Sequence, residues 1–175
     1  EDQRGFDIHK RYISVSTSGR VDGIRKLAEL NWPGLNLAVS LNAPNDPIRS
    51  LIMPVNKLYP MEELRKAMIE FPIKKNGAVY VEYVLIKHVN DARRHARQLA
   101  EYLAPMRAKV NLIAYNPRTS SSFEPPSEED VDRFLDWLVE ERVFVRKRSS
   151  RGRSIRAACG QLGTKTNIRE MKTGW

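Results

Sequence analysis

Apolar residues along this chain recur at two different spacings, which alternate from one segment to the next. A spacing of two predicts a β-strand, and a spacing of three to four predicts an α-helix. Strands are predicted at residues 11–18, 35–41, 78–86, 109–115 and 143–147. Helices are predicted at residues 21–30, 61–71, 91–103 and 128–141, the last with Ser127 as its N-cap. Residues 42–47 are rich in Asn and Pro and are interpreted as a turn.

The alternation of strands and helices predicts an α/β fold with right-handed crossovers and a parallel sheet. Four or five such units are too few for a closed eight-stranded barrel, so they fit part of an open barrel or a small doubly wound sheet. Small polar residues occupy alternate positions of the first two strands: Ser14, Ser16 and Ser18 on one, Asn36 and Ser40 on the other. Such side chains near the carboxyl ends of parallel strands are typical of a barrel active site, so they favour a partial barrel.

The charge of the chain is concentrated at one end. The 175 residues carry a formal net charge of +9, and the segment from Arg142 to Trp175 accounts for all of it. We therefore expect two parts: residues 1–141 as a neutral partial barrel, and residues 142–175 as a basic C-terminal strand and tail. A basic segment of this kind indicates a polyanionic partner.

Cysteine usage limits the chemistry further. Cys159 is the single cysteine, so no internal disulfide can form and a reducing, cytoplasmic compartment is expected. The histidines His9, His88 and His95 lack the spacing of a zinc motif, and His88 and His95 are expected at the surface, so no metal ligands are predicted. No apolar stretch is long enough to span a bilayer, and no membrane association is expected. The first residues lack an initiating Met and read as the middle of a longer polypeptide.

Four stretches carry polar or reactive residues in a recognisable order: VSTSG at 15–19, AVSLNAPND at 38–46, VNLIAYNP at 110–117 and AACGQL at 157–162. Their order and spacing closely resemble the C-terminal half of the RlmN/Cfr family. Members of this family are radical S-adenosylmethionine enzymes that methylate adenosine in 23S ribosomal RNA and, for RlmN, also in tRNA. The resemblance runs from about residue 5 to Leu162 and implies the later strands of a radical S-adenosylmethionine barrel.

The resemblance also implies a site. The positions that match the family's S-adenosylmethionine contacts are Ser16, Ser40, Leu41, Asn42 and Asn116. Cys159 matches the cysteine that becomes methylated and carries the methyl group to RNA. Asn42 departs from the family, which usually has His there. Asn can donate and accept hydrogen bonds, but it cannot titrate.

The family's 4Fe-4S cluster is held by a Cys-x-x-x-Cys-x-x-Cys loop, which one cysteine cannot supply. Its ligands are expected upstream. We therefore interpret the chain as a C-terminal half that is inactive alone, exposes a sheet edge at residues 11–18, and is a monomer when complete. An electron donor for the cluster is implied as a further partner.

RNA contacts are expected from cations in the basic segment, each able to neutralise a phosphate. The candidates are Arg146, Lys147, Arg148, Arg151, Arg153 and Arg156. Tyr115 and Phe123 are candidates for base stacking, with packing favoured for Phe123. An alternative stays open: a non-catalytic, basic α/β RNA-binding module with a vestigial cofactor pocket.

Overall fold

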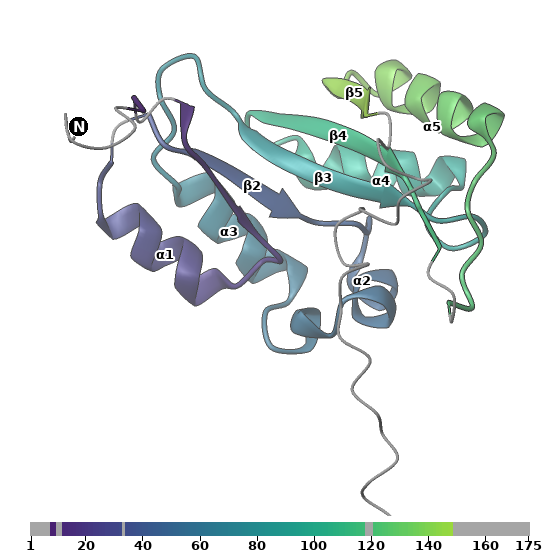
Figure 1. Ribbon diagram of the computed structural model, residues 1–175, viewed down its shortest axis with the longest axis horizontal. Helices are drawn as coiled ribbons and strands as arrows, with labels where there is room; N and C mark the ends of the chain where they lie inside the picture. The colour runs from purple at the N-terminus through teal and green to yellow at the C-terminus, as the bar shows by residue number, and fades with distance from the viewer. Residues whose placement is uncertain (1–7, 10–11, 33, 118–120, 149–175) are drawn as a thin grey trace, which may run out of the picture.

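Five parallel strands form one sheet in the order β1-β2-β3-β4-β5 (Figure 1). The structure is a computed structural model that describes residues 8–9, 12–32, 34–117 and 121–148. The strands are β1 (Ser14–Thr17), β2 (Asn36–Ser40), β3 (Val79–Leu85), β4 (Ala108–Ala114) and β5 (Val145–Arg148). Each lies within one of the predicted strands or begins or ends one residue from it. The predicted α/β fold with a parallel sheet is therefore confirmed.

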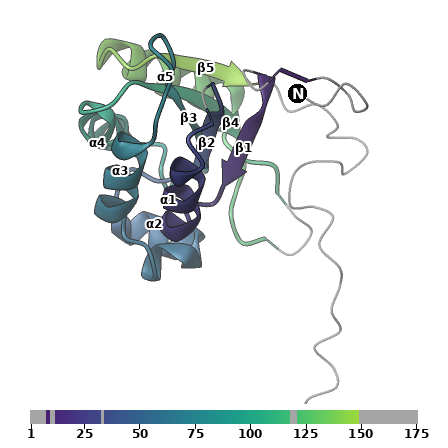
Figure 2. The ribbon, with the colours of Figure 1, turned by 90° about the vertical axis from the view of Figure 1, so that its left-hand side faces the viewer.

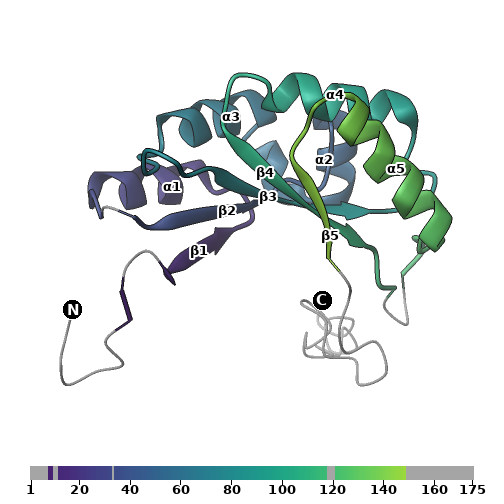
Figure 3. The same cartoon turned by 90° about the horizontal axis from the view of Figure 1, so that it is seen from above.

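The connections between strands are helical. The helices are α1 (Val21–Glu29), α2 (Asp46–Ile52), the 3₁₀ helix η2 (Pro54–Lys57), α3 (Met61–Glu70), α4 (Arg93–Leu103) and α5 (Glu128–Glu140). Figures 2 and 3 show these helices gathered on one side of a curved sheet, whose other side they leave uncovered. A sheet covered on one side, with neighbouring parallel strands in sequence order, is the arrangement of a partial barrel.

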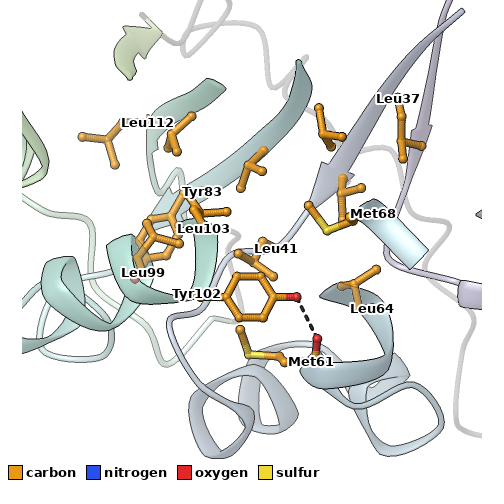
Figure 4. Close-up of a cluster of buried hydrophobic side chains, with 14 of the residues drawn as sticks. Leu37, Leu41, Met61, Leu64, Met68, Tyr83, Leu99, Tyr102, Leu103 and Leu112 are labelled. Atoms are coloured by element: carbon orange, nitrogen blue, oxygen red, sulfur yellow. Dashed lines mark hydrogen bonds between the residues drawn. The ribbon is translucent and has the colours of Figure 1, made fainter. Parts of the chain in front are cut away.

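The core lies between the sheet and the helices. Alternate strand residues such as Val39, Val81 and Leu112 are fully buried, and they pack in one cluster with helix residues such as Leu64 and Leu99. Figure 4 shows this cluster. Burying each of these side chains contributes about 1.5–3 kcal/mol to the stability of the fold. The helices are therefore held against the sheet by this shared core. Within the cluster, the Tyr102 hydroxyl donates to the Met61 carbonyl at 2.8 Å (Figure 4).

The interpretation of residues 42–47 as a turn is partly wrong, because α2 begins at Asp46. The Asn45 side chain accepts a hydrogen bond from the Ile48 backbone N–H at 3.1 Å and so caps the helix. Pro47 lies in the first turn, where a missing N–H breaks no helical hydrogen bond. Asn and Pro favour turns, but the same residues favour the start of a helix.

The expectation for His95 is also wrong. Its side chain is buried at the start of α4, and its Nδ1 accepts a hydrogen bond from the Ala92 N–H at 3.2 Å. An imidazole in the first turn of a helix can accept from a backbone N–H that has no partner within the helix. Because this bond replaces one to water, the ring can be buried. His88 is exposed, as predicted. Ser127 caps α5 as predicted, and its Oγ accepts from the Asp130 N–H at 3.1 Å.

The two edge strands of the described sheet are β1 and β5. The first matches the expected edge at residues 11–18. The second places residues 145–148 of the basic segment within the sheet, paired with β4. None of the helices in the described ranges is long and apolar enough to cross a bilayer.

Candidate functional site

The uncovered face of the sheet is polar and slightly hollow. Residues from all five strands line an open hollow of about 300 Å³, and they are Ser14, Ser16, Asn36, Ala38, Tyr80, Glu82, Asn111 and Arg148. Pairing of Ser16 with Ala38, and of Glu82 with Asn111, brings these side chains into register on one face. The alternation of serine and apolar residues in β1 thus corresponds to the two sides of the sheet. We call this surface the polar hollow.

Glu82 is the acid of the polar hollow. The Asn111 amide donates to Glu82 Oε1 at 2.7 Å, and the Arg148 guanidinium lies 3.7 Å from Oε2. That second oxygen is buried and accepts no hydrogen bond within the described part of the chain. Arg148 balances the charge at Oε2 without a hydrogen bond, so this oxygen can still accept from a donor on a ligand. Sequence reasoning noted Glu82 on the predicted third strand but assigned it no role, and it missed Asn111.

The positions predicted to bind a cofactor fall on this face or at the carboxyl ends of its strands. Ser16 is exposed in the polar hollow, and Ser40 ends β2 beside Glu82. The Leu41 side chain is fully buried, its N–H donates to the Glu82 carbonyl at 3.0 Å, and its carbonyl accepts from Arg49. Leu41 therefore has no exposed side chain to offer.

Asn42 holds the end of β2 against β3. Its backbone is in the left-handed region, with φ of 58°, which Asn tolerates better than most residues. Its side-chain oxygen accepts from the Val84 N–H at 3.0 Å, and its Nδ2 lies 3.3 Å from the Met53 sulfur. Both polar atoms of the side chain are engaged, so a ligand contact here would have to replace one of these bonds.

Asn116 lies two residues beyond the end of β4. Its side-chain Nδ2 is buried, and no hydrogen-bond acceptor for it is found in the described ranges. Buried amides are nearly always satisfied, because an unpaired one costs about 1–3 kcal/mol. A buried donor that no described residue satisfies, at the carboxyl end of a strand, indicates a place for a ligand acceptor.

Arg49 was missed by sequence reasoning. It is fully buried and donates to the Ser18 carbonyl at 2.7 Å, the Leu41 carbonyl at 3.2 Å and the Asn56 side-chain oxygen at 2.9 Å. Burial lowers the pKa of its guanidinium. The residue thus fixes the carboxyl ends of β1 and β2, where Ser16 and Ser40 lie. No local pattern in the sequence distinguishes Arg49 from an exposed arginine.

The candidate RNA contacts divide between the two sides of the sheet. Arg146 and Arg148 face the polar hollow, because they pair with Asn111 and Ile113 at alternate positions of β5. Lys147 points to the helical side, and its Nζ lies 2.5 Å from Asp132. These cations therefore do not form one continuous surface.

Other predicted residues have different outcomes. Arg151, Arg153, Arg156 and Cys159 lie outside the described residues. The Tyr115 and Phe123 rings pack edge to face with centroids 6.3 Å apart, and the Tyr115 hydroxyl donates to Ser121 Oγ at 2.6 Å. The favoured packing of Phe123 is therefore confirmed. Over the described ranges, no three His, Cys, Asp or Glu side chains are grouped to hold a metal ion.

The chain is 43% identical over 162 residues to a protein of Protochlamydia amoebophila named "Probable dual-specificity RNA methyltransferase RlmN 1", covering 93% of this chain and 45% of that protein. It is 42% identical to a "Dual-specificity RNA methyltransferase RlmN" of Nitratiruptor, covering 95% of this chain and 46% of that protein. Over more than nine tenths of its length, this chain is similar to RlmN proteins. No protein-family model matches it.

A solved structure agrees with this similarity. The radical SAM methyltransferase from Sphaerobacter thermophilus superimposes with a TM-score of 0.85 at 41% identity, covering 91% of this chain and 47% of that one. The chain therefore spans about half the length of the RlmN relatives it matches. The sheet described above corresponds to part of a radical SAM methyltransferase fold.

Proposed function

We propose that this chain is the C-terminal half of an RNA methyltransferase that uses S-adenosylmethionine in radical chemistry. The proposal is supported by its similarity to RlmN proteins named as RNA methyltransferases. The observation that carries it is the buried Asn116 amide, which has no acceptor among the described residues and lies at the carboxyl edge of a sheet with a polar open face. We further propose an adenosine of 23S ribosomal RNA, and of tRNA, as the target.

The residues present fit S-adenosylmethionine, which supplies an activated methyl group. Its amino acid and ribose parts carry hydroxyl, ammonium and carboxylate groups that need directional partners. Asn116 would donate from its Nδ2, which has no acceptor within the described ranges, and the Ser16 and Ser40 hydroxyls can both donate and accept. The available oxygen of Glu82 would accept from a donor or balance a positive charge.

The residues of this chain do not fit a 4Fe-4S cluster, since a single cysteine cannot supply three thiolates. We therefore assign no cluster ligand to this chain and expect it to be inactive by itself. Cys159 is proposed as the residue that carries the methyl group to RNA. We also propose that the complete protein is a monomer and that it acts in the cytoplasm. Reduction of the cluster by an electron donor belongs to the same proposal.

Equilibrium dialysis with labelled S-adenosylmethionine tests the proposed site. Replacing Asn116 by Ala should weaken binding about tenfold, the effect of losing about 1.4 kcal/mol. The free energy of unfolding should be retained, because the removed Nδ2 has no partner among the described residues. Asn76→Ala, in an exposed loop, is the matched control and should bind like the unchanged chain.

Two results would contradict the proposal. Absence of saturable binding, or equal affinity for the Asn116→Ala variant, would favour the non-catalytic RNA-binding module instead. The role of Cys159 is tested separately by tryptic mass analysis of the methylating protein that carries this chain. An added methyl group on the peptide containing Cys159 is expected, and an unmodified peptide during turnover contradicts that role.

A further inference from the structure

A second hollow lies at the amino ends of β3, β4 and β5, at the opposite edge of the sheet from Asn116. It is open and has a volume of about 430 Å³. Its lining includes Asn76, Met106, Arg107, Lys109, Arg142 and Phe144. We call it the basic hollow. In parallel barrels the catalytic site lies at the carboxyl ends of the strands, so this surface is not part of the proposed cofactor site.

The basic hollow contains cations without matching acids. Arg107, Lys109 and Arg142 all line it, and none of its lining residues is Asp or Glu. In the described ranges, no carboxylate forms an ion pair with these three cations. By contrast, Arg93 and Arg97 on α4 pair with Glu140 and Glu141. Cations left unpaired around one concave surface attract an anion.

The loop before β3 extends the same charge. Lys74 and Lys75 are exposed there, and the Arg107 guanidinium donates a hydrogen bond to the Lys75 carbonyl. This bond holds the loop against the start of β4. The positive surface therefore continues from the hollow onto the loop.

Arg142 occupies a backbone position that favours glycine. Its φ is 60°, and it follows the end of α5, where the Arg142 N–H donates to the Val139 carbonyl and the Val143 N–H to the Leu138 carbonyl, both at 2.9 Å. These two bonds form a Schellman motif, whose left-handed residue is usually Gly. An arginine there costs about 1 kcal/mol relative to Gly. The left-handed backbone disfavours arginine at this position, while the C-terminal end of the α5 dipole favours its positive charge by about 0.3–1 kcal/mol.

Phe144 adds an aromatic surface beside these cations. It is 58% exposed, and the Lys109 ammonium lies 5.1 Å from the centre of its ring. An exposed ring next to unpaired lysine and arginine side chains is typical of proteins that bind single-stranded nucleic acid, because bases stack on the ring while cations contact phosphates.

We propose that the basic hollow binds a single-stranded stretch of RNA, at the end of the sheet opposite the cofactor site. This contact is additional to the RNA contacts proposed for residues 146–156. It does not depend on whether the chain methylates RNA, because it involves neither the polar hollow nor Cys159. A target RNA long enough to reach both ends of the sheet would be held at two places.

The test measures binding of a fluorescent oligouridine of about twelve nucleotides to the full chain by anisotropy. Arg142→Gly should lower the affinity about threefold and reduce the slope of log affinity against log salt by about 0.7. The same variant should unfold at an equal or higher temperature, because Gly relieves the left-handed strain. Weaker binding with undiminished stability separates a contact from a folding defect.

Phe144→Ala should lower the affinity about fivefold or more through loss of stacking. The controls are Arg25→Gln, which removes one exposed charge from α1, and Leu58→Ala, which removes an exposed apolar side chain far from the hollow. Both controls should bind nearly as the unchanged chain does.

Three results would overturn the proposal. One is affinity for oligouridine that Arg142→Gly and Phe144→Ala change no more than the controls do. Another is competition by polyglutamate as strong as by unlabelled oligouridine, which would indicate an acidic protein partner. The third is complete loss of binding when Arg151, Arg153 and Arg156 become Gln while the basic hollow is intact. This third result would overturn the proposed RNA contact at the basic hollow, but not the proposed methyltransferase function.

Discussion

Arg49 donates a hydrogen bond from Nη2 to the Ser18 carbonyl at 2.7 Å, so a residue of α2 holds the chain where β1 ends. The same guanidinium reaches the Leu41 carbonyl, one residue beyond β2. No carboxylate forms an ion pair with it in the described ranges, although the negative charge of Asp46 is close enough to favour the charged guanidinium. Two adjacent strands of the polar hollow therefore depend on one buried cation for the position of their ends.

Replacing Arg49 by Met should lower the free energy of unfolding by about 3 kcal/mol or more. The variant keeps much of the apolar volume but leaves the Ser18 and Leu41 carbonyls and the Asn56 side-chain oxygen without their donor. Urea unfolding followed by circular dichroism measures the change. Arg49→Lys is the control, and it should recover only part of the loss, because an ammonium lacks the planar set of donors. Full recovery with Lys would show that charge alone matters.

Gly19→Ala tests the space that Arg49 needs. The backbone of Gly19 has a φ of 99°, and an added Cβ would lie 2.5 Å from Arg49 Nη2 and 3.0 Å from Leu64 Cδ2. We expect a loss of about 2 kcal/mol or more, from backbone strain and from displacement of the guanidinium. Gly23→Ala, on α1, is the control, since its nearest neighbour would be 3.8 Å away. A similar thermal midpoint for both variants would contradict the tight contact at Gly19.

The sheet was predictable because its signals are local. Alternation in residues 14–18 and 36–40 placed serine and asparagine on one side, and the structure finds that side open and polar. The same rule applied to residues 145–148 would have separated Lys147 from Arg146 and Arg148. Successive residues of a strand point to opposite faces of the sheet, so the period of two that identified the strand also predicts that these cations do not form one group.

What could not be predicted depends on contacts between distant segments. Arg49 and Ser18 are 31 residues apart, and no local pattern indicates that the first becomes buried beneath the second. The burial of Asn116 Nδ2 away from every acceptor in the described ranges depends equally on how the neighbouring strands pack. In both cases the residue type was readable, whereas its partners were set by packing of the whole sheet.

Asn42→Gly and Asn42→Ala together separate conformation from hydrogen bonding. Gly accepts a φ of 58° without strain but loses the bond to the Val84 N–H, so we expect a loss of about 1–2 kcal/mol. Ala loses the same bond and adds the left-handed strain, for a total about 1 kcal/mol greater. Guanidinium unfolding of both variants gives the difference. Equal loss in the two would mean that the left-handed backbone carries no penalty here.

The stability of the fold should fall as the pH drops below neutral, through His95. Burial, reinforced by the neighbouring Arg94 and opposed by Asp91, lowers the pKa of His95 from its usual 6.5. The unfolded chain takes up a proton near that usual value while the folded chain resists it, so the contribution is complete above about pH 7 and is lost as the pH falls toward the folded pKa. Protonation of Nδ1 would also remove the acceptor of the Ala92 N–H at the start of α4.

Urea midpoints measured between about pH 8 and pH 5.5 test this contribution. They should decline less steeply for His95→Gln than for the unchanged chain, since His9 and His88 remain in both. Parallel declines would show that the buried imidazole is not the source of the pH dependence.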